Sequence, residues 1–205
     1  MCFHSKQTKK AIEVEHRFNA KIETIDAFQT AEHYNGFEFP KTPVITNEDS
    51  SKIQMIHWGL LPKWANEEFD KKNTLNARIE TLSSKISFKN IINNRCIIIV
   101  NGFFEWQKIG KNKLKYEIGF HDELFAFAGL YDVNNGKKTY TIVTTEAQGI
   151  MREIHNTKLR MPFTLQTDED FNNWLQQKEV VPKYNFSTLP KLYMQQKLFK
   201  KKNIK

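Results

Sequence analysis

The run Cys96-Ile97-Ile98-Ile99-Val100 is apolar at every position and gives the strongest strand signal in the chain. A short continuous apolar run rich in β-branched residues is typical of a strand that is buried on both faces. The run is far shorter than the roughly 18 apolar residues that a membrane-spanning helix requires. We therefore predict a fully buried strand at residues 96–100.

Further strands are predicted on either side of this run. Residues 114–120 have an apolar or aromatic side chain at every second position, including Tyr116, Ile118 and Phe120. Residues 124–131 and 139–145 follow at hairpin spacing, and Asn134-Asn135-Gly136 between them is a favourable turn. Residues 53–60 also form a strand-like stretch.

Helices are predicted to flank these strands. The polar segment from Ser5 to about Phe18 has helical character with Ser5 as its N-cap, and residues 76–84 are compatible with a short helix. Residues 168–177 form an amphipathic helix capped by Thr167 or Asp168. Residues 34–49 are expected to be a loop that leads into a strand. This pattern predicts an α+β fold with a mostly antiparallel sheet.

The net charge of +8 over 205 residues is concentrated at one end of the chain. Residues 191–205 carry six lysines and no acidic residue, whereas the remaining 190 residues carry 25 basic and 23 acidic side chains. We predict one domain over residues 1–190 and a basic C-terminal tail over residues 191–205. The charge alone does not establish a nucleic-acid partner, because a solubilising tail explains it equally well.

The two cysteines, Cys2 and Cys96, are too few for a disulfide framework, which favours a reducing cytosol. The first residues turn polar at once, so we expect no signal peptide, no membrane association and a cytoplasmic location. The six histidines have no metal-ligand spacing, and no glycine-rich phosphate loop occurs. We expect neither a metal nor a cofactor, and we expect Cys96 to be an inert core residue.

Cys2 could have unusual reactivity, because removal of Met1 would leave an α-amine and a thiol on adjacent carbons. An α-amine titrates at about pH 7.7–8.0, so part of it is neutral and nucleophilic at pH 7. The amine can condense with an aldehyde to a Schiff base, and the thiol can then close a five-membered thiazolidine ring. The alternative is a terminal thiol without a role.

Four other segments carry candidate functional side chains. Glu105 lies among aromatic residues in the segment 101–106, where desolvation would raise its pKa toward the range of a general acid or base. His155 could shuttle protons near neutral pH. Asn76 and Arg78 lie in the segment 75–80, and the segment 57–64 contains two tryptophans. Each has an ordinary structural explanation: a surface Glu, an exposed His, an N-cap Asn or a core Trp.

Together these segments resemble one family, the SOS response associated peptidase (SRAP) family of abasic-site processing proteins. The matching segments occur in the order of the family and extend from residue 2 to about residue 175. They are Cys2, His57–Trp64, Asn76–Thr81, Asn101–Trp106, Ala128–Tyr131, and His155 with Arg160–Pro162.

The resemblance implies a single domain with a barrel-like β core and a groove for single-stranded DNA that ends at the N-terminal cysteine. It implies that Met1 is removed by the protein's own activity and that Cys2 then captures the aldehyde of an abasic site as a thiazolidine. Asn76 would position the N-terminal residue, and Glu105 and His155 would transfer protons. DNA contacts would come from two arginines, two tryptophans and a threonine: Arg78, Arg160, Trp64, Trp106 and Thr144.

The sequence departs from the family pattern at three places: Ile86 stands at a usually basic position, with Lys85 next to it, and the other two departures adjoin candidate site residues. Phe3 and His4 stand where the family often has Gly and Arg, which removes a phosphate contact unless His4 is protonated. Four residues separate His155 from Arg160, so this loop must bulge. Two other functions stay open: an N-terminal-nucleophile peptidase or amidase that cleaves amide bonds, and a non-enzymatic nucleic-acid-binding module. A monomer is the expected oligomeric state.

Overall fold

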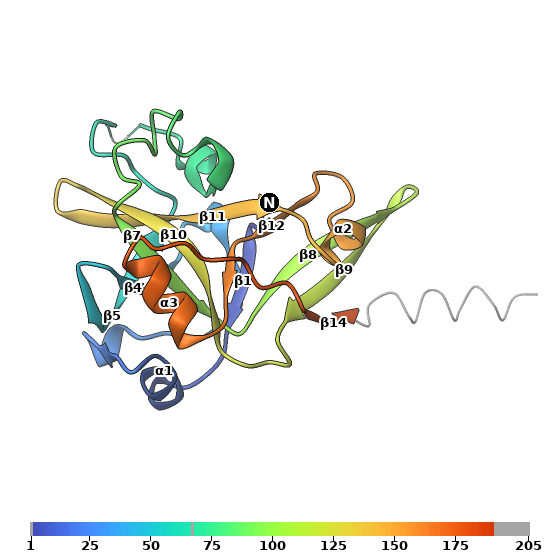
Figure 1. Cartoon of the computed structure of the whole chain (residues 1–205), viewed down its shortest axis with the longest axis horizontal. Helices are drawn as coiled ribbons and strands as arrows, with labels where there is room; N and C mark the ends of the chain where they lie inside the picture. Colours follow the sequence, from blue (N-terminus) through green and yellow to red (C-terminus); the bar gives the residue numbers. More distant parts are fainter. Residues whose placement is uncertain (1, 67, 191–205) are drawn as a thin grey trace, which may run out of the picture.

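Strand β7 (Arg95–Val100) lies inside the larger of two sheets in this computed structural model, which describes residues 2–66 and 68–190 (Figure 1). Its neighbours are β4 (Lys41–Thr46) and β10 (Phe125–Asn134), both antiparallel to it. The side chains from Cys96 to Val100 are all buried. The predicted buried strand is therefore confirmed.

The larger sheet follows the order β12-β11-β10-β7-β4-β5-β2, with β6 paired to β11 and β13 paired to β10. Strand β5 also pairs with β11 in parallel, so that β4, β5, β7, β10 and β11 close into a barrel-like ring. The bounds not yet given are β2 (Lys21–Ile22), β5 (Asp49–Trp58), β6 (Asn76–Arg78), β11 (Lys137–Glu146), β12 (Arg160–Pro162) and β13 (Thr164–Leu165).

The smaller sheet has the order β14-β9-β8-β1-β3, and its described pairings are antiparallel. Its strands are β14 (Ser187–Pro190), β9 (Asn112–Gly119), β8 (Gly102–Ile109), β1 (His4–Gln7) and β3 (Ala31–Asn35). The helices are α1 (Ala11–Phe18), α2 (Met151–Ile154) and α3 (Asp168–Leu175), with single 3-10 turns at Ile25–Ala27, Gly36–Glu38, Lys71–Thr74 and Ile79–Thr81.

Alternating residues of β7 contribute to two different cores. Ile98 packs with Phe103 of β8 in the core between the two sheets. Ile97 and Ile99 point to the other face, where they pack with Trp174 of α3. Because successive strand residues point to opposite faces, the larger sheet is covered on both sides. This arrangement confirms the α+β prediction with a mostly antiparallel, barrel-like core and flanking helices.

Two of the predicted helices are wrong in part or in full. Helix α1 begins only at Ala11, with Lys10 as its N-cap, and Ser5 lies on strand β1 opposite Phe103. Residues 76–84 contain β6 and one 3-10 turn instead of a helix, because the backbone of β6 pairs with β11. In both segments tertiary pairing overrides a weak local helical preference.

The predicted loop at residues 34–49 is also mostly strand. It contains the end of β3, a 3-10 turn and β4, whose Val44 and Ile45 are buried. Other local predictions are confirmed. Asn135 and Gly136 have positive φ values of 49° and 74° at the β10–β11 turn, as a tight hairpin requires. Thr167 caps α3 through its side chain.

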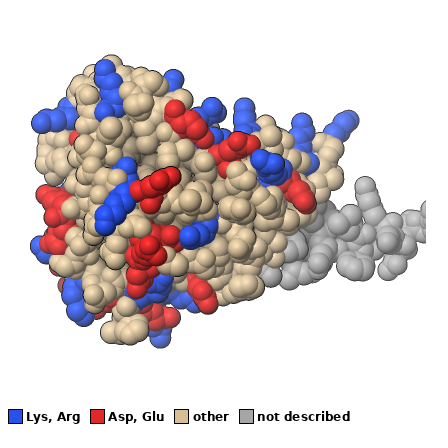
Figure 2. All heavy atoms as spheres, viewed as in Figure 1, with Lys and Arg blue, Asp and Glu red and all other residues tan. Residues whose placement is uncertain are grey.

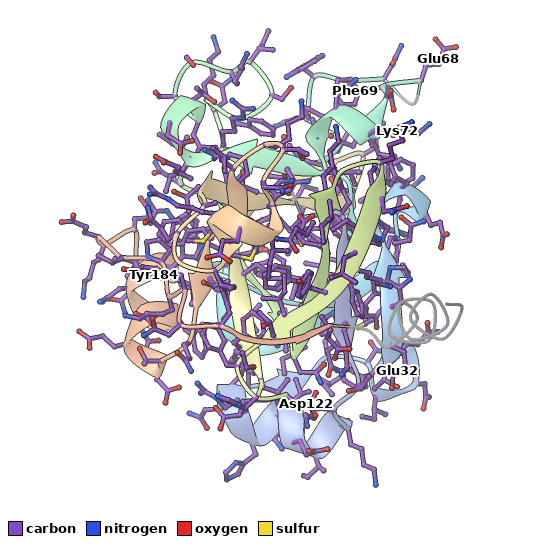
Figure 3. The ribbon with its side chains drawn as sticks, turned by 90° about the vertical axis from the view of Figure 1, so that its right-hand side faces the viewer. Glu32, Glu68, Phe69, Lys72, Asp122 and Tyr184 are labelled. Carbon is purple, nitrogen blue, oxygen red and sulfur yellow. The ribbon has the colours of Figure 1, made fainter. Side chains whose placement is uncertain are left out.

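The loop after β5 and helix α1 lie at opposite ends of the molecule, and Figure 3 shows Phe69 and Lys72 far from Asp122. In the part of the chain that the structure describes, no helix is both long and apolar enough to cross a membrane. The basic tail predicted at residues 191–205 lies outside the described residues.

Candidate functional site

Cys2 lies two residues before the start of strand β1 and is fully buried. Strand β1 pairs with β8 on one side and with β3 on the other, so the start of the chain is held within the smaller sheet. The Gly36 amide donates to the Phe3 carbonyl at 2.8 Å, which holds the residue between Cys2 and β1. Burial, with a smaller contribution from the Glu105 carboxylate, raises the pKa of the Cys2 thiol. The thiol is therefore neutral at pH 7.

Asn76 contacts the main chain of Cys2. Its Nδ2 atom donates to the Cys2 carbonyl oxygen at 2.8 Å. Parallel pairing with β11, in register with Ile142, and a hydrogen bond from the Trp58 indole to the adjacent Leu75 carbonyl fix the backbone here. The Asn76 Oδ1 atom is buried and accepts no hydrogen bond from the described residues. The carboxamide therefore has an acceptor still available to a ligand.

Glu105 lies on β8 and is only 6% exposed. Burial raises the pKa of its carboxyl group to about 7. A carboxyl group with this pKa exchanges a proton near neutral pH, which suits general acid and base catalysis. The expectation from sequence that desolvation raises the pKa of Glu105 agrees with this result.

His155 directly follows α2 and faces Glu105. Its Nδ1 atom lies 2.7 Å from the Arg160 carbonyl oxygen and 3.3 Å from the Arg160 amide nitrogen. Because the carbonyl oxygen can only accept and makes the shorter contact, we assign the ring proton to Nδ1. The Nε2 atom then presents its lone pair at 4.0 Å from Glu105 Oε2. Burial lowers the pKa of His155, which favours the neutral ring. The bulge expected between His155 and Arg160 includes Leu159 with a φ of +51°.

Arg160 is 8% exposed and is bound within the protein. Its two Nη atoms donate to the Glu80 carboxylate at 2.8 and 2.9 Å, and Nη2 also donates to the Thr144 carbonyl. Although partial burial acts in the opposite direction, Arg160 lowers the pKa of Glu80. Thr144 is itself fully buried. The expected DNA contacts of Arg160 and Thr144 stay predictions, since neither side chain is open to solvent.

The other expected DNA-binding residues lie at different places around this cluster. Arg78 is exposed at the end of β6, in register with Thr144. Trp106 follows Glu105 on β8 and packs edge-on against His4, with ring centroids 4.8 Å apart. Trp64 is 54% exposed, on the loop that Asn134 binds through the Ala65 carbonyl. This position is near the β10–β11 turn, about 17 Å along β11 from the register of Asn76.

The structure gives His4 a partner that sequence reasoning did not find. Its Nδ1 atom lies 2.8 Å from Nε2 of His33. Burial, together with the nearby His33 and Lys115, lowers the pKa of His4 to about 4. His4 is therefore neutral at pH 7 and does not supply the positive charge that Arg would supply at this position. Glu80 was also missed as a partner of Arg160, although it lies in the quoted segment 76–81.

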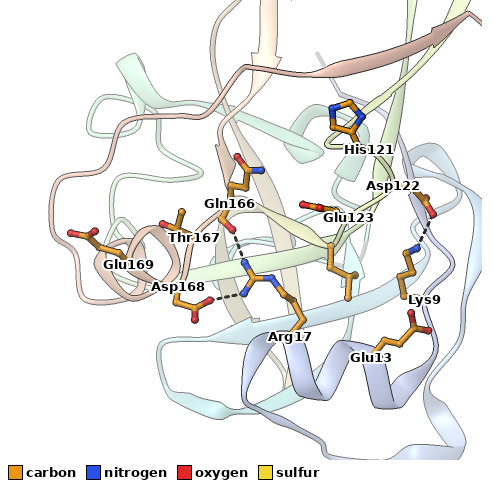
Figure 4. A pocket seen from close by; sticks show the side chains of 11 residues that line it. Lys9, Glu13, Arg17, His121, Asp122, Glu123, Gln166, Thr167, Asp168 and Glu169 are labelled. Atoms are coloured by element: carbon orange, nitrogen blue, oxygen red, sulfur yellow. Dashed lines mark hydrogen bonds and ion pairs between the residues drawn. The ribbon is translucent and has the colours of Figure 1, made fainter.

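The described residues contain no cluster of three or more His, Cys, Asp or Glu side chains that could hold a metal ion. One wide cleft lies between α1 and the start of α3, and its lining includes none of Cys2, Asn76, Glu105 and His155 (Figure 4). Both of its basic residues form ion pairs across or beside it, Lys9 with Asp122 and Arg17 with Asp168. On the face in Figure 2, acidic and basic side chains are interspersed.

Comparison with known proteins places these residues in context. A family model described as SOS response associated peptidase (SRAP) matches residues 1–201. Over 154 residues the chain is 39% identical to the abasic site processing protein YoqW of Bacillus subtilis, covering 71% of this chain and 67% of that protein. It is 33% identical over 164 residues to the abasic site processing protein HMCES of Gallus gallus, covering 65% of this chain and 48% of that protein.

The fold is also found in solved structures. A crystal structure of a protein from Bacteroides thetaiotaomicron superposes with a TM-score of 0.84 at 33% identity, covering 96% of this chain and 94% of that chain. A protein from Bordetella bronchiseptica shares the fold at 18% identity, with a TM-score of 0.75 and coverage of 92% and 99%.

Proposed function

This chain belongs to the SOS response associated peptidase (SRAP) family, and from this premise we propose that it processes abasic sites in DNA. Cys2, once Met1 is removed, would crosslink to an abasic site in single-stranded DNA as a thiazolidine and shield the lesion. The names of the relatives support an activity at abasic sites. The observation that carries the crosslinking step is the position of Cys2, bonded by Asn76 and near the buried Glu105.

The proposed reaction consumes an aldehyde and an aminothiol and releases one water molecule. The α-amine of Cys2 attacks the aldehyde carbon of the ring-opened sugar, and the resulting carbinolamine loses water to give a Schiff base. The thiol sulfur then attacks the same carbon while its proton passes to a base. A five-membered ring results, with no external oxidant or reductant, so the proposal includes no cofactor and no metal.

The buried thiol determines which proton transfers the protein must assist. Because the pKa of the Cys2 thiol is raised, ring closure requires a base, and Glu105 in its ionised form is suited to accept that proton. Glu105 in its protonated form is suited to assist the loss of water. His155, with its Nε2 lone pair toward Glu105, is suited to accept a proton from the Glu105 carboxyl group, to pass that proton to the opening sugar and to assist reversal.

We propose that the DNA strand is held by a small number of placed groups. Exposed Arg78 would contact a phosphate, and Trp106 and Trp64 would stack on bases at two separated points. Arg160 could reach a phosphate only by exchanging its bonds to Glu80, and Thr144 would contribute only indirectly, since both are buried. The proposal further takes the protein to act as a monomer in the cytoplasm during the DNA damage response.

The family description includes a peptidase, and we propose that this activity is the removal of Met1 by the protein itself. Removal generates the free amine that the crosslink requires. The alternative is an N-terminal-nucleophile peptidase or amidase acting on other amide bonds. It predicts turnover of amide substrates and no reaction with abasic DNA.

A denaturing gel tests the proposal directly. The protein with a native start is incubated with a single-stranded oligonucleotide that holds one abasic site, alongside Cys2→Ser and a variant that retains an uncleavable N-terminal tag. We expect a heat-stable crosslink with the wild-type protein that has the native start, and none with Cys2→Ser or with the tagged variant. Lack of a crosslink to intact abasic DNA would overturn the proposal, and a crosslink from the tagged protein would exclude the aminothiol mechanism.

A further inference from the structure

The strand that carries Glu105 also binds the segment around His155. The Lys108 amide of β8 donates to Asn156 Oδ1 at 3.1 Å, and Asn156 Nδ2 donates to the Lys108 carbonyl at 2.9 Å. One carboxamide therefore satisfies both backbone polar groups of a single strand residue. Among the described residues, the pairing of β1 with β8 is at Gly102 and Phe103, near the other end of β8, so Asn156 takes the place of a neighbouring strand at Lys108.

A second contact holds the other side of His155. Gln107 Nε2 donates to the Glu153 carbonyl at 3.2 Å, and the Tyr116 hydroxyl donates to Gln107 Oε1 at 3.0 Å, which orients the Gln107 amide. Adjacent residues of β8 thus bind the chain two positions before His155 and one position after it. Because Glu105 lies on the same strand, these contacts fix the position of the His155 segment relative to Glu105.

We propose that Asn156 is a positioning residue that fixes His155 opposite Glu105. The inference rests on the proposed function in that it assigns His155 a proton-transfer role. Asn156 acts through the main chain: its two bonds hold the bulge between His155 and Arg160 against β8. The bulge in turn keeps the Arg160 carbonyl 2.7 Å from His155 Nδ1 and directs Nε2 toward Glu105.

The chain offers a matched control in the next residue. Asn156 and Thr157 are both exposed, but the Thr157 side chain makes no hydrogen bond to the described residues. Asn156→Ala removes both bonds to β8, whereas Asn156→Asp keeps the acceptor and places an anion beside the Lys108 carbonyl. Thermal unfolding of each variant shows whether the fold is retained, as we expect for exposed positions.

Imidazole NMR of the protein without DNA gives the first readout, with the His155 signals assigned from His155→Gln. In the wild type and in Thr157→Ala we expect the Nδ1–H tautomer and titration below the ordinary pKa. In Asn156→Ala we expect mixed tautomers and a titration moved by about 0.5 pH unit or more toward the ordinary value near 6.5. An unchanged His155 signal in both Asn156 variants would overturn the inference.

Crosslinking rates give the second readout through a double-mutant cycle. Asn156→Ala should slow crosslink formation roughly five- to twentyfold in the wild type and less than twofold when His155 is Ala, with affinity for intact single strands unchanged. An equal loss in both backgrounds would contradict a role through His155. If the wild type forms no crosslink, the proposed function fails, while the NMR comparison still decides whether Asn156 positions His155.

Discussion

The Nε2 atom of His155 lies 4.0 Å from Oε2 of Glu105, and both side chains are buried. Burial acts on the two groups in opposite directions, because it raises the pKa of the acid to about 7 and lowers that of the imidazole. Near neutral pH the pair can therefore hold a proton on the carboxyl group while the ring stays neutral. The raised pKa of Glu105 and the lowered pKa of His155 therefore give the two side chains different proton-transfer roles within one reaction.

Glu105→Gln should change how stability depends on pH. The Glu105 carboxyl binds its proton at about pH 7 in the folded chain and near its ordinary value of 4.5 in the unfolded chain. Wild-type stability relative to the variant is therefore fully present below about pH 4.5 and is lost as the pH rises toward 7. The loss should be about 3 kcal/mol. Urea unfolding at pH 4.5, 6 and 8 measures it, and a difference independent of pH would contradict it.

Asn76→Ala should slow crosslinking because Cys2 loses the amide that fixes its carbonyl oxygen. A small misplacement of a reacting group costs up to about 100-fold in rate, so we expect a loss of about 10- to 100-fold with little change in affinity for undamaged DNA. Single-turnover gels measure the rate. Asn112→Ala, at an exposed position at the start of β9, is the control. An unchanged rate in Asn76→Ala would argue against the positioning role.

Glu80→Gln should lower stability and strengthen DNA binding at the same time. The variant leaves the buried Arg160 guanidinium without its counter-charge, while the Glu80 side chain itself is 46% exposed. We expect a loss of about 1–2 kcal/mol, reduced from that of a fully buried pair by solvent screening. Removal of the negative charge should also raise affinity for single strands a fewfold at low salt. Fluorescence anisotropy measures the affinity, and weaker binding would show that Arg160 does not contact phosphate.

Removal of residues 191–205 should weaken DNA binding mainly at low salt. The segment contributes six positive charges, and each charge that neutralises a phosphate adds to the salt dependence of binding. Plots of affinity against salt concentration for the full and shortened chains should differ in slope. The crosslinking rate at saturating DNA should be unchanged. Loss of the crosslink would mean that the segment takes part in the chemistry.

Sequence patterns predicted the central strands well, because residues 96–100 and the β10–β11 hairpin carry their own local signals. They failed for residues 4–7 and 76–78, where neighbouring strands impose an extended backbone on polar segments. The same two segments hold Cys2 and Asn76 in place. Local periodicity does not contain such long-range pairing, which explains why the supporting structure of the candidate residues was not predicted.

The charge states and ion-pair partners of the candidate site residues were only partly predictable from the sequence. Desolvation of Glu105 followed from the aromatic residues next to it in sequence. The contact of His4 with His33 and that of Arg160 with Glu80 join residues 29 and 80 positions apart. A single sequence gives no spacing signal for such pairs, so the charge state of His4 and the burial of Arg160 required the structure.

The placement of β1 between β8 and β3 has a mechanical consequence. A DNA strand attached at residue 2 would transmit tension from a passing motor protein into the backbone of β1. Tension along the axis of that strand loads its hydrogen bonds to both neighbours in shear, together and not one after another. Strand β1 would therefore resist being pulled out of the sheet by the attached DNA more strongly than a free terminal arm would resist the same force.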